Sequence, residues 1–420
     1  MKTTLLKGPL IVTQNSSRDI LRANILIDNG TIAYIGPDEP QADETIDYRN
    51  RLVCPGFINT HTHVAMTHLR GRLDDIGLSE FLRETSALDS ERTSRGIFNS
   101  ALLGLYEMAA SGVTTFLDLY YSEDVIAQAC QKVGIRGYLA WATLDDDKTT
   151  QKGSPLDNAR RFLANTKRTG LVHPCVGVQG VYAASDEVYL KARDLAEEHG
   201  TILHSHLAET REEVYGFRKI RNERPAEHLH KIGVTGRNFV GAHGVWLTMN
   251  EVRMLASDGA TISWNPVSNS KLGVGGVAQV PEMLAAGLNV SIGSDSAGSN
   301  NSQDILSSMK FGSMMIKNER WDPSSIRAQE LMDMATLRGA KALQNDVIGS
   351  IEVGKSADMV AFDMESPFIS PVIPETAVKS IVYGSSIGAI KDVMVNGNFV
   401  KRDGALIGYD PAYFEDCNFI

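Results

Sequence analysis

The chain has 420 residues, of which 43% are hydrophobic and 22% charged, with a formal net charge of −10. This composition is typical of a folded globular protein and excludes a disordered, collagen-like or coiled-coil chain. The acidic balance disfavours nucleic acid polymers and anionic membranes, because both carry phosphate charge. Four cysteines without C-x-x-C spacing favour free thiols in a reducing compartment. No apolar run approaches the ~18 residues that span a bilayer, and no signal peptide is recognisable, so we expect a cytoplasmic protein without a membrane partner.

Short strands are predicted at both ends of the chain. Near the N-terminus, Asn29-Gly30 lies between "ANILI" and "TIAYIG", which is typical of a β-hairpin with a tight turn. Near the C-terminus, strands are expected in "ADMVAFDM" and "KSIVYG", and Asn396-Gly397 marks a second hairpin. We expect the two ends to form one small β-domain.

The middle of the chain alternates strand-like runs with amphipathic helical segments, which predicts a parallel sheet. Eight strand candidates close a (β/α)₈ barrel, whereas an open doubly wound sheet would share the alternation. The absence of a G-x-G-x-x-G or P-loop fingerprint favours the barrel. The eight candidates are "PGFINTHTH", "VTTFLDLYY", "IRGYLAWAT", "LVHPCVGVQG", "TILHSH", "NFVGAH", "TISWNP" and "NVSIGSD".

Polar residues that can bind metal follow several of these strands. His61 and His63 are two residues apart, so an extended backbone sends both side chains to one face. His206, His243 and Asp295 end later strands, and the carboxyl ends of barrel strands meet at one pocket. Imidazole and carboxylate suit Zn²⁺ or Fe²⁺. Each residue alone is explained equally well as a hydrogen-bonded pair or a turn cap; their joint placement predicts a metal centre.

Six segments carry a family resemblance, in order between about residues 53 and 360. They are "PGFINTHTHVAMTHLRG", "HSHLAET", "GAHGVWL", "NPVSNSKLG", "GSDSAGSNNSQDIL" and "GSIEVGKSADMV". On these segments the chain resembles the amidohydrolase superfamily, in particular its cytosine-deaminase-like and methylthioadenosine/S-adenosylhomocysteine-deaminase-like branch. The resemblance implies an α/β fold, with a barrel over residues 55–346 and a β-sandwich built from residues 1–54 and 347–420.

The resemblance also implies the roles of individual residues. It makes His61, His63, His206 and Asp295 the ligands of the metal. Binuclear members bridge two ions with a lysine of the fourth barrel strand, and "LVHPCVGVQG" contains none, so one divalent ion is expected. Glu209 and His243 are placed at the chemistry. We leave His204 as a supporting or packing residue, and His68 without an assigned role.

These residues predict a hydrolytic deaminase. A divalent ion lowers the pKa of bound water and so supplies a nucleophile at neutral pH. Glu209, three residues after His206, is placed to carry protons to the ring nitrogen and to the departing ammonia. Asp295 can take a proton from the attacking water, and His243 can polarise the reacting centre. A triazine-type chlorohydrolase is an alternative, but chloride needs no protonation on leaving.

The substrate is expected to be a small aminated heterocycle of purine, pteridine, pyrimidine or triazine type. Nucleoside deaminases of this branch carry a W-P-x-E stretch that engages ribose and a G-P-H-S stretch after the fourth strand. Here "SALDSE" and "VQGVYAAS" stand in their places, which favours a free heterocycle and leaves the nucleoside as the alternative. Asp89 could replace the glutamate, Gln179 could pair with the ring edge, and Trp141 could stack on the ring or serve in packing. A homodimer is the commonest state for such enzymes.

Overall fold

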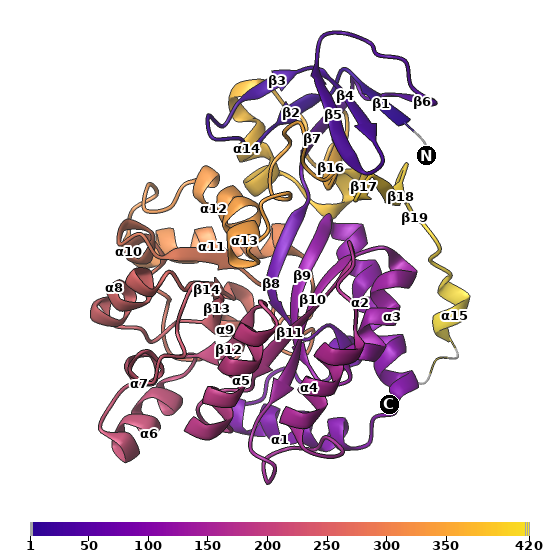
Figure 1. Ribbon diagram of the computed structural model, residues 1–420. Coiled ribbons are helices and arrows are strands. Elements are labelled where there is room, and N and C mark those ends of the chain that lie inside the picture. The colour runs from indigo at the N-terminus through magenta and orange to yellow at the C-terminus, as the bar shows by residue number, and fades with distance from the viewer. Residues whose placement is uncertain (1–2, 416, 418, 420) are drawn as a thin grey trace.

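Eight consecutive strands lie parallel and in chain order in one sheet (Figure 1). The sheet closes between its first and last strands through a parallel bridge from Thr62 to Asp295, where the Asp295 N–H donates to the carbonyl oxygen of His61 at 2.9 Å. All eight predicted strands are therefore confirmed, and so is the barrel. They are β8 (Phe57–Thr62), β9 (Val113–Tyr120), β10 (Arg136–Thr143), β11 (Val172–Val178), β12 (Leu203–Leu207), β13 (Phe239–His243), β14 (Thr261–Trp264) and β15 (Asn289–Ile292).

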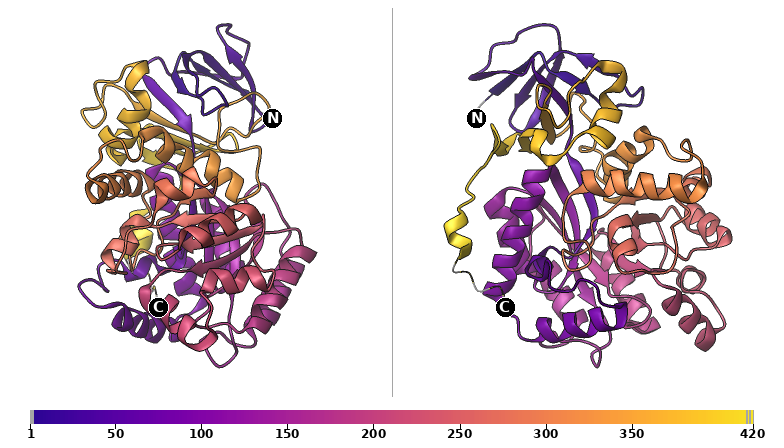
Figure 2. Two further views of the ribbon diagram at one scale, coloured as in Figure 1. Left: turned by 90° about the vertical axis from the view of Figure 1, so that its left-hand side faces the viewer. Right: turned by 180° about the vertical axis from the view of Figure 1, so that it is seen from behind.

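Amphipathic helices cover the outer face of the barrel (Figure 2). In α3 (Glu123–Val133), for example, Ile126, Cys130 and Val133 are buried at helical spacing, as expected for a surface helix. The other barrel helices include α1 (Leu78–Ser90), α2 (Ser94–Ser111), α4 (Pro155–Asn165), α5 (Asp186–Glu198), α6 (Arg211–Arg221), α7 (Pro225–Lys231), α8 (Met249–Asp258), α9 (Pro266–Lys271), α10 (Val280–Ala285), α11 (Ile305–Arg320), α12 (Ala328–Ala335) and α13 (Leu337–Ala342). The 3₁₀ helix η1 (Val64–Leu69) follows β8 directly.

Two further sheets lie above the barrel in Figure 1. The four-stranded sheet comes from the N-terminal end alone, and the seven-stranded sheet combines strands from both ends of the chain. One sheet has the order β5-β4-β1-β6 and the other β19-β18-β17-β16-β7-β2-β3. Their shared core includes Ile11, Val53 and Met359. The strands are β1 (Thr3–Lys7), β2 (Leu10–Val12), β3 (Ile20–Arg22), β4 (Asn24–Asp28), β5 (Thr31–Gly36), β6 (Glu44–Asp47), β7 (Arg51–Pro55), β16 (Met359–Asp363), β17 (Ile390–Val395), β18 (Asn398–Arg402) and β19 (Ala405–Leu406).

Both predicted hairpins are confirmed, β4 with β5 and β17 with β18. Asn29 and Gly30 have positive φ, and so do Asn396 and Gly397, as a tight hairpin turn requires. The strand predicted in "KSIVYG" is wrong. That segment is helical, in α14 (Ala377–Lys379) and η3 (Ser380–Gly384), because its buried residues fall at helical rather than alternating spacing.

The small domain and helix α1 lie at opposite ends of the barrel (Figure 1). Arg136 at the start of β10 pairs with Asp358 beside β16, and both side chains are buried, so the β-domain is tied to the amino ends of the strands. The computed structural model describes residues 3–415, 417 and 419. Within these ranges no helix is long and apolar enough to cross a membrane. The domain limits expected at residues 54/55 and 346/347 stay a prediction.

Candidate metal centre and active site

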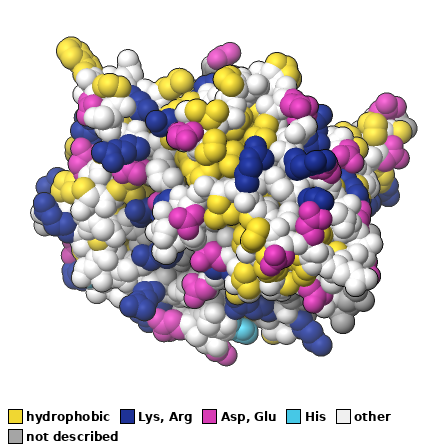
Figure 3. Space-filling view, turned by 90° about the horizontal axis from the view of Figure 1, so that it is seen from above, with side chains coloured by type: hydrophobic (Ala, Val, Ile, Leu, Met, Phe, Trp, Pro, Cys, Tyr) yellow, Lys and Arg dark blue, Asp and Glu magenta, His cyan; other side chains and the backbone are white. Residues whose placement is uncertain are grey.

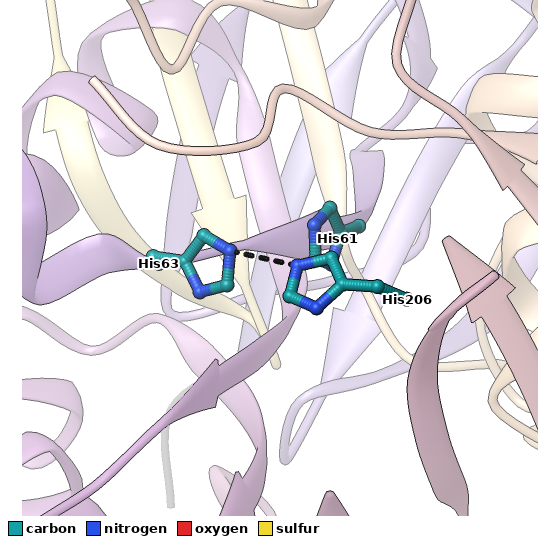
Figure 4. Close-up of side chains that lie close together, drawn as sticks. All are labelled: His61, His63 and His206. Carbon is teal, nitrogen blue, oxygen red and sulfur yellow. Dashed lines mark hydrogen bonds between the residues drawn. The ribbon is translucent and has the colours of Figure 1, made fainter. Parts of the chain in front are cut away.

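Three of the predicted side chains, His61, His63 and His206, lie together at the carboxyl ends of the strands (Figure 4), and Asp295 lies against them. His63 Nε2 lies 3.3 Å from His206 Nε2 and 3.3 Å from Asp295 Oδ1, and His61 Nε2 lies 3.5 Å from the same carboxylate oxygen. His61 lies in β8, His63 directly follows that strand, His206 comes from β12, and Asp295 follows β15. The two-residue spacing does place both histidines in one cluster. This cluster could hold a metal ion.

The outer nitrogens of the imidazoles fix the direction of their lone pairs. His206 Nδ1 lies 2.6 Å from the carbonyl oxygen of Gln179, and His63 Nδ1 is hydrogen bonded to the carbonyl oxygen of Leu119. A carbonyl can only accept, so each Nδ1 carries the proton and each Nε2 faces the cluster with a lone pair. The Nε2 atom of His61 is buried without a partner. The donor set therefore matches what a divalent ion requires.

Burial and charge act in opposite directions at the cluster. Burial lowers the pKa of His61 and of His206, so both rings are neutral. Burial opposes ionisation of Asp295, but its contacts with His61 and His63 outweigh it and hold the pKa of Asp295 low. Burial also opposes protonation of His63, yet the hydrogen bond and charge of Asp295 raise the pKa of His63. The carboxylate thus favours a positive charge at this point.

Glu209 and His243 lie beside the cluster. Glu209 Oε2 is 3.8 Å from His243 Nε2. Burial, then the charges of Asp295 and Glu213, raise the pKa of Glu209 well above its usual range, which favours its protonated form. Burial lowers the pKa of His243 to about 4, which keeps its ring neutral.

The tautomer of His243 is opposite to that of the cluster histidines. The side-chain amide nitrogens of Asn265 and Asn269 lie 3.2 Å and 2.8 Å from His243 Nδ1. Because amide nitrogens donate, Nδ1 accepts and Nε2 keeps the proton. His243 therefore presents an N–H, rather than a lone pair, towards Glu209 and the cluster.

Several supporting residues were not singled out from the sequence. Ser268 donates to Asp295 Oδ2 at 2.5 Å, and together with Asn265 and Asn269 it belongs to "NPVSNSKLG". That segment follows β14 at the same end of the barrel, so its position was the available signal. Left-handed backbone at His243 (φ 80°) and Asp295 (φ 62°) marks strained strand ends that cluster at functional sites, and no residue type in the sequence signals it.

The three residues predicted on the substrate side differ in their surroundings. Asp89, at the end of α1, accepts a hydrogen bond from the Tyr120 hydroxyl at 2.6 Å. Burial raises the pKa of Asp89, against the lowering effects of Tyr120, Arg92 and His63. Gln179 donates through Nε2 to Tyr182 at 3.3 Å, beside His206.

Trp141 lies in the packing between the barrel and its helices. Its indole N–H donates to Gln151 at 2.9 Å, and its ring contacts Phe162 of α4 with centroids 5.5 Å apart. Ala140 and Ala142, on the other face of β10, line the barrel interior. The stacking role considered for Trp141 does not fit this position, because alternate residues of a strand point to opposite faces.

A closed eight-stranded barrel with a His/Asp cluster and an adjacent glutamate is typical of a barrel hydrolase able to hold a metal ion. The chain belongs to the amidohydrolase family, whose family model matches residues 52–400. It is thus a hydrolase acting on C–N bonds.

Relatives agree with this family membership over nearly the whole chain. The chain is 34% identical to a 5'-deoxyadenosine deaminase of Methanopyrus kandleri, covering 98% of this chain and 96% of the relative. It is 34% identical to a 5-methylthioadenosine/S-adenosylhomocysteine deaminase of Thermococcus sibiricus, covering 94% and 93%. Among solved structures, an adenosine deaminase of Xanthomonas campestris with bound zinc superposes with a TM-score of 0.92 at 26% identity, covering 98% of this chain and 95% of the other.

Proposed function

We propose that the protein is a metal-dependent hydrolytic deaminase of an aminated nitrogen heterocycle, working with one Zn²⁺ or Fe²⁺ ion. The observation that carries the proposal is the convergence of His61, His63, His206 and Asp295 on one point, with Glu209 beside them. Imidazole and carboxylate groups are preferred ligands of these ions. The ion would supply activated water for attack on an electron-poor ring carbon.

The protein's own groups then move the protons of the reaction. Asp295 accepts a proton from the attacking water. Glu209, whose pKa is raised by burial, delivers a proton to the ring nitrogen. It then takes the proton of the hydroxyl that has added to the ring carbon and passes it to the amino group, which leaves as ammonia, and the proton held by Asp295 returns to Glu209 and restores both groups. His243 donates its Nε2–H to the oxygen that adds to the ring. A buried proton carrier supports an amine leaving group over chloride, and so favours deamination over the triazine-type chlorohydrolase.

The finer substrate class we propose is an adenosine-type nucleoside, in place of the free heterocycle favoured by the sequence. The relatives named above are deaminases of 5'-deoxyadenosine and of methylthioadenosine and S-adenosylhomocysteine. Asp89 supports the same class, because it stands in the place of the ribose-binding glutamate of W-P-x-E and the Tyr120 hydroxyl holds its carboxylate in position. A carboxylate accepts hydrogen bonds from both hydroxyls of a ribose diol, and the amide of Gln179 offers a donor and an acceptor to the ring edge.

Ammonia release from a panel of compounds tests both the proposed reaction, deamination, and the proposed substrate class, an adenosine-type nucleoside. We expect the zinc-loaded protein to deaminate 5'-deoxyadenosine or methylthioadenosine with a kcat/KM more than tenfold above that for adenine, cytosine, a pterin or an aminotriazine. Two sugar hydrogen bonds of about 1 kcal/mol each are worth more than a factor of ten.

Asp89→Asn is the matched variant, because it keeps the size of the side chain and an acceptor for Tyr120. It should lose the preference for nucleosides and still turn over adenine at the wild-type rate. A wild-type preference for free bases would return the assignment to the free heterocycle. Release of chloride from a chlorotriazine, without ammonia from any amine, would contradict deamination.

The setting of the enzyme follows from its composition. We propose that the enzyme is cytoplasmic, acts on small molecules and works as a homodimer. The four cysteines are free thiols, and Cys54, Cys130 and Cys175 are buried, which suits a reducing compartment. The face of the molecule seen in Figure 3 mixes acidic and basic side chains with apolar ones between them, and the net charge of −10 opposes attraction to polyanions.

A further inference from the structure

A fourth histidine, His204, lies directly behind the cluster. It precedes His206 by two residues on β12, so both rings point into the barrel, where His61 and His63 face them from β8. The deeper pair is hydrogen bonded, with His61 Nδ1 2.8 Å from His204 Nε2. The outer pair, His63 and His206, turns both Nε2 atoms towards the cluster. Two H-x-H segments thus oppose each other in two layers.

The hydrogen bonds of His204 fix the direction of this contact. His204 Nδ1 lies 2.7 Å from the carbonyl oxygen of Val240, so Nδ1 carries the proton. In the neutral ring Nε2 then has only a lone pair and accepts the Nδ1–H of His61. The remaining lone pair of His61, on Nε2, then faces Asp295 and the cluster.

His61 differs in this respect from the other two cluster histidines. His63 and His206 donate Nδ1–H to main-chain carbonyls of Leu119 and Gln179, which cannot be removed by a side-chain substitution. His61 donates to an imidazole instead. Its orientation depends on one side chain, and that side chain is fully buried.

We propose that His204 is a positioning residue that holds His61 with its Nε2 lone pair towards the metal and thereby sets how tightly the centre binds its ion. The inference rests on the proposed function only in taking His61 as a metal ligand. Outer partners of metal-binding histidines typically contribute 10–100-fold in metal affinity. Removal of His204 leaves a buried N–H of His61 without an acceptor, which favours rotation of the His61 ring away from its binding orientation.

Three substitutions separate positioning from packing. His204→Gln can place an amide oxygen near the position of Nε2 and so keeps an acceptor for His61. His204→Asn reaches only the position of Nδ1, keeps the contact with Val240 and loses the acceptor. His204→Phe fills the space without polar atoms. His173→Asn is the matched control, because His173 is a buried histidine that stacks on Tyr138 with centroids 4.2 Å apart and contacts none of the cluster.

The experiment measures the dissociation constant of Zn²⁺ by competition with a chromogenic chelator, with circular dichroism to verify folding. We expect Asn and Phe at position 204 to weaken Zn²⁺ binding at least tenfold, and Gln and the His173 control to stay within about threefold of wild type. Wild-type affinity in His204→Asn, or equal weakening by Gln and Phe, would overturn the proposal.

A measurement on the metal-free protein separates this proposal from the proposed function. The ¹⁵N chemical shifts of the His61 ring should report a proton on Nδ1 in the metal-free wild type and in His204→Gln, and a mixture of tautomers in His204→Asn. If the His61 ring of the wild-type protein is protonated on Nε2, the role proposed for His204 is contradicted. If the His61 ring has the expected tautomer but the protein binds no divalent ion, only the metal centre is contradicted.

Discussion

The role of each imidazole of the site depends on the hydrogen-bond partner of its Nδ1 atom, which faces away from the cluster. His61, His63 and His206 donate through Nδ1 and face the cluster with lone pairs. His243 accepts at Nδ1 from Asn265 and Asn269 and faces Glu209 with an N–H. In the proposed mechanism the same side chain would serve as a ligand in three places and as a hydrogen-bond donor in the fourth, because ligands need a lone pair and a developing oxyanion needs a donor.

At the residue scale, Glu209→Gln should separate metal binding from turnover. The amide has the same shape but cannot carry protons, and general acid–base groups contribute about 10²–10⁴-fold. We expect kcat to fall by that factor, whereas zinc content, measured by elemental analysis, stays at the wild-type value. Glu212→Gln, an exposed neighbour in the first turn of α6, is the control and should keep full activity. A kcat for Glu209→Gln within twofold of wild type would remove this residue from the mechanism.

At the element scale, the barrel strands could be predicted because each combines an apolar run with a turn signal and a following amphipathic helix. The ends of the chain were harder. "KSIVYG" has strand composition, but packing of Ile381 and Val382 against the body of the protein selects a helix. His61 and His63 could be placed from spacing alone. The roles of His204, Ser268 and Asn269 depend on contacts between different strands, and no local pattern reports such contacts.

A buried carboxyl pair joins β9, η1 and α3. Asp118 Oδ1 accepts from the Val64 N–H at 2.8 Å, Glu123 Oε1 accepts from the Tyr120 N–H at 3.1 Å, and the second oxygen of each carboxyl is buried without a partner. Burial raises the pKa of Asp118 to about 7, and burial together with Asp118 raises the pKa of Glu123. Two such groups cannot both ionise at low cost, so the pair retains a proton.

This pair should make the folded protein less stable as pH rises. A carboxyl whose pKa is raised by folding stabilises the protein below its unfolded pKa, and the contribution is lost as pH rises through its folded pKa. For Asp118 the loss falls between about pH 4 and pH 7. Asp118→Asn removes this pH-dependent contribution to the free energy of unfolding. Each unit of pKa shift corresponds to about 1.4 kcal/mol. Between pH 5 and pH 8, we expect the free energy of unfolding to fall less in Asp118→Asn than in wild type, by at least ~1 kcal/mol.

Urea unfolding at a series of pH values measures this difference. Asp124→Asn, an exposed residue of the same helix, is the control and should follow the wild-type curve. Parallel curves for wild type and Asp118→Asn would show that the pair does not retain a proton.

At the scale of the whole molecule, the cluster connects distant parts of the barrel. His61 lies on β8 and His63 directly after it, His206 lies on the fifth strand β12, and Asp295 follows the last strand β15, beside the point where the barrel closes. A metal ion held by all four residues would bind the folded chain and not the unfolded one, and so would stabilise the closed barrel by mass action.

Metal removal should therefore lower the melting temperature. At a free-ion concentration of about 100 times the dissociation constant, binding contributes roughly 2.7 kcal/mol, and each kcal/mol shifts Tm by about 2–4 °C for domains of this order of size. We expect calorimetry to give a Tm several degrees higher for the zinc-loaded protein than after chelation, with about one ion per chain by elemental analysis. His61→Ala and Asp295→Ala remove a ligand, so their Tm should not respond to chelator or to added zinc. If chelation lowers the Tm of these variants as much as that of wild type, the ion binds elsewhere, because these variants lack a side chain needed to join the first and last strands of the barrel through the ion.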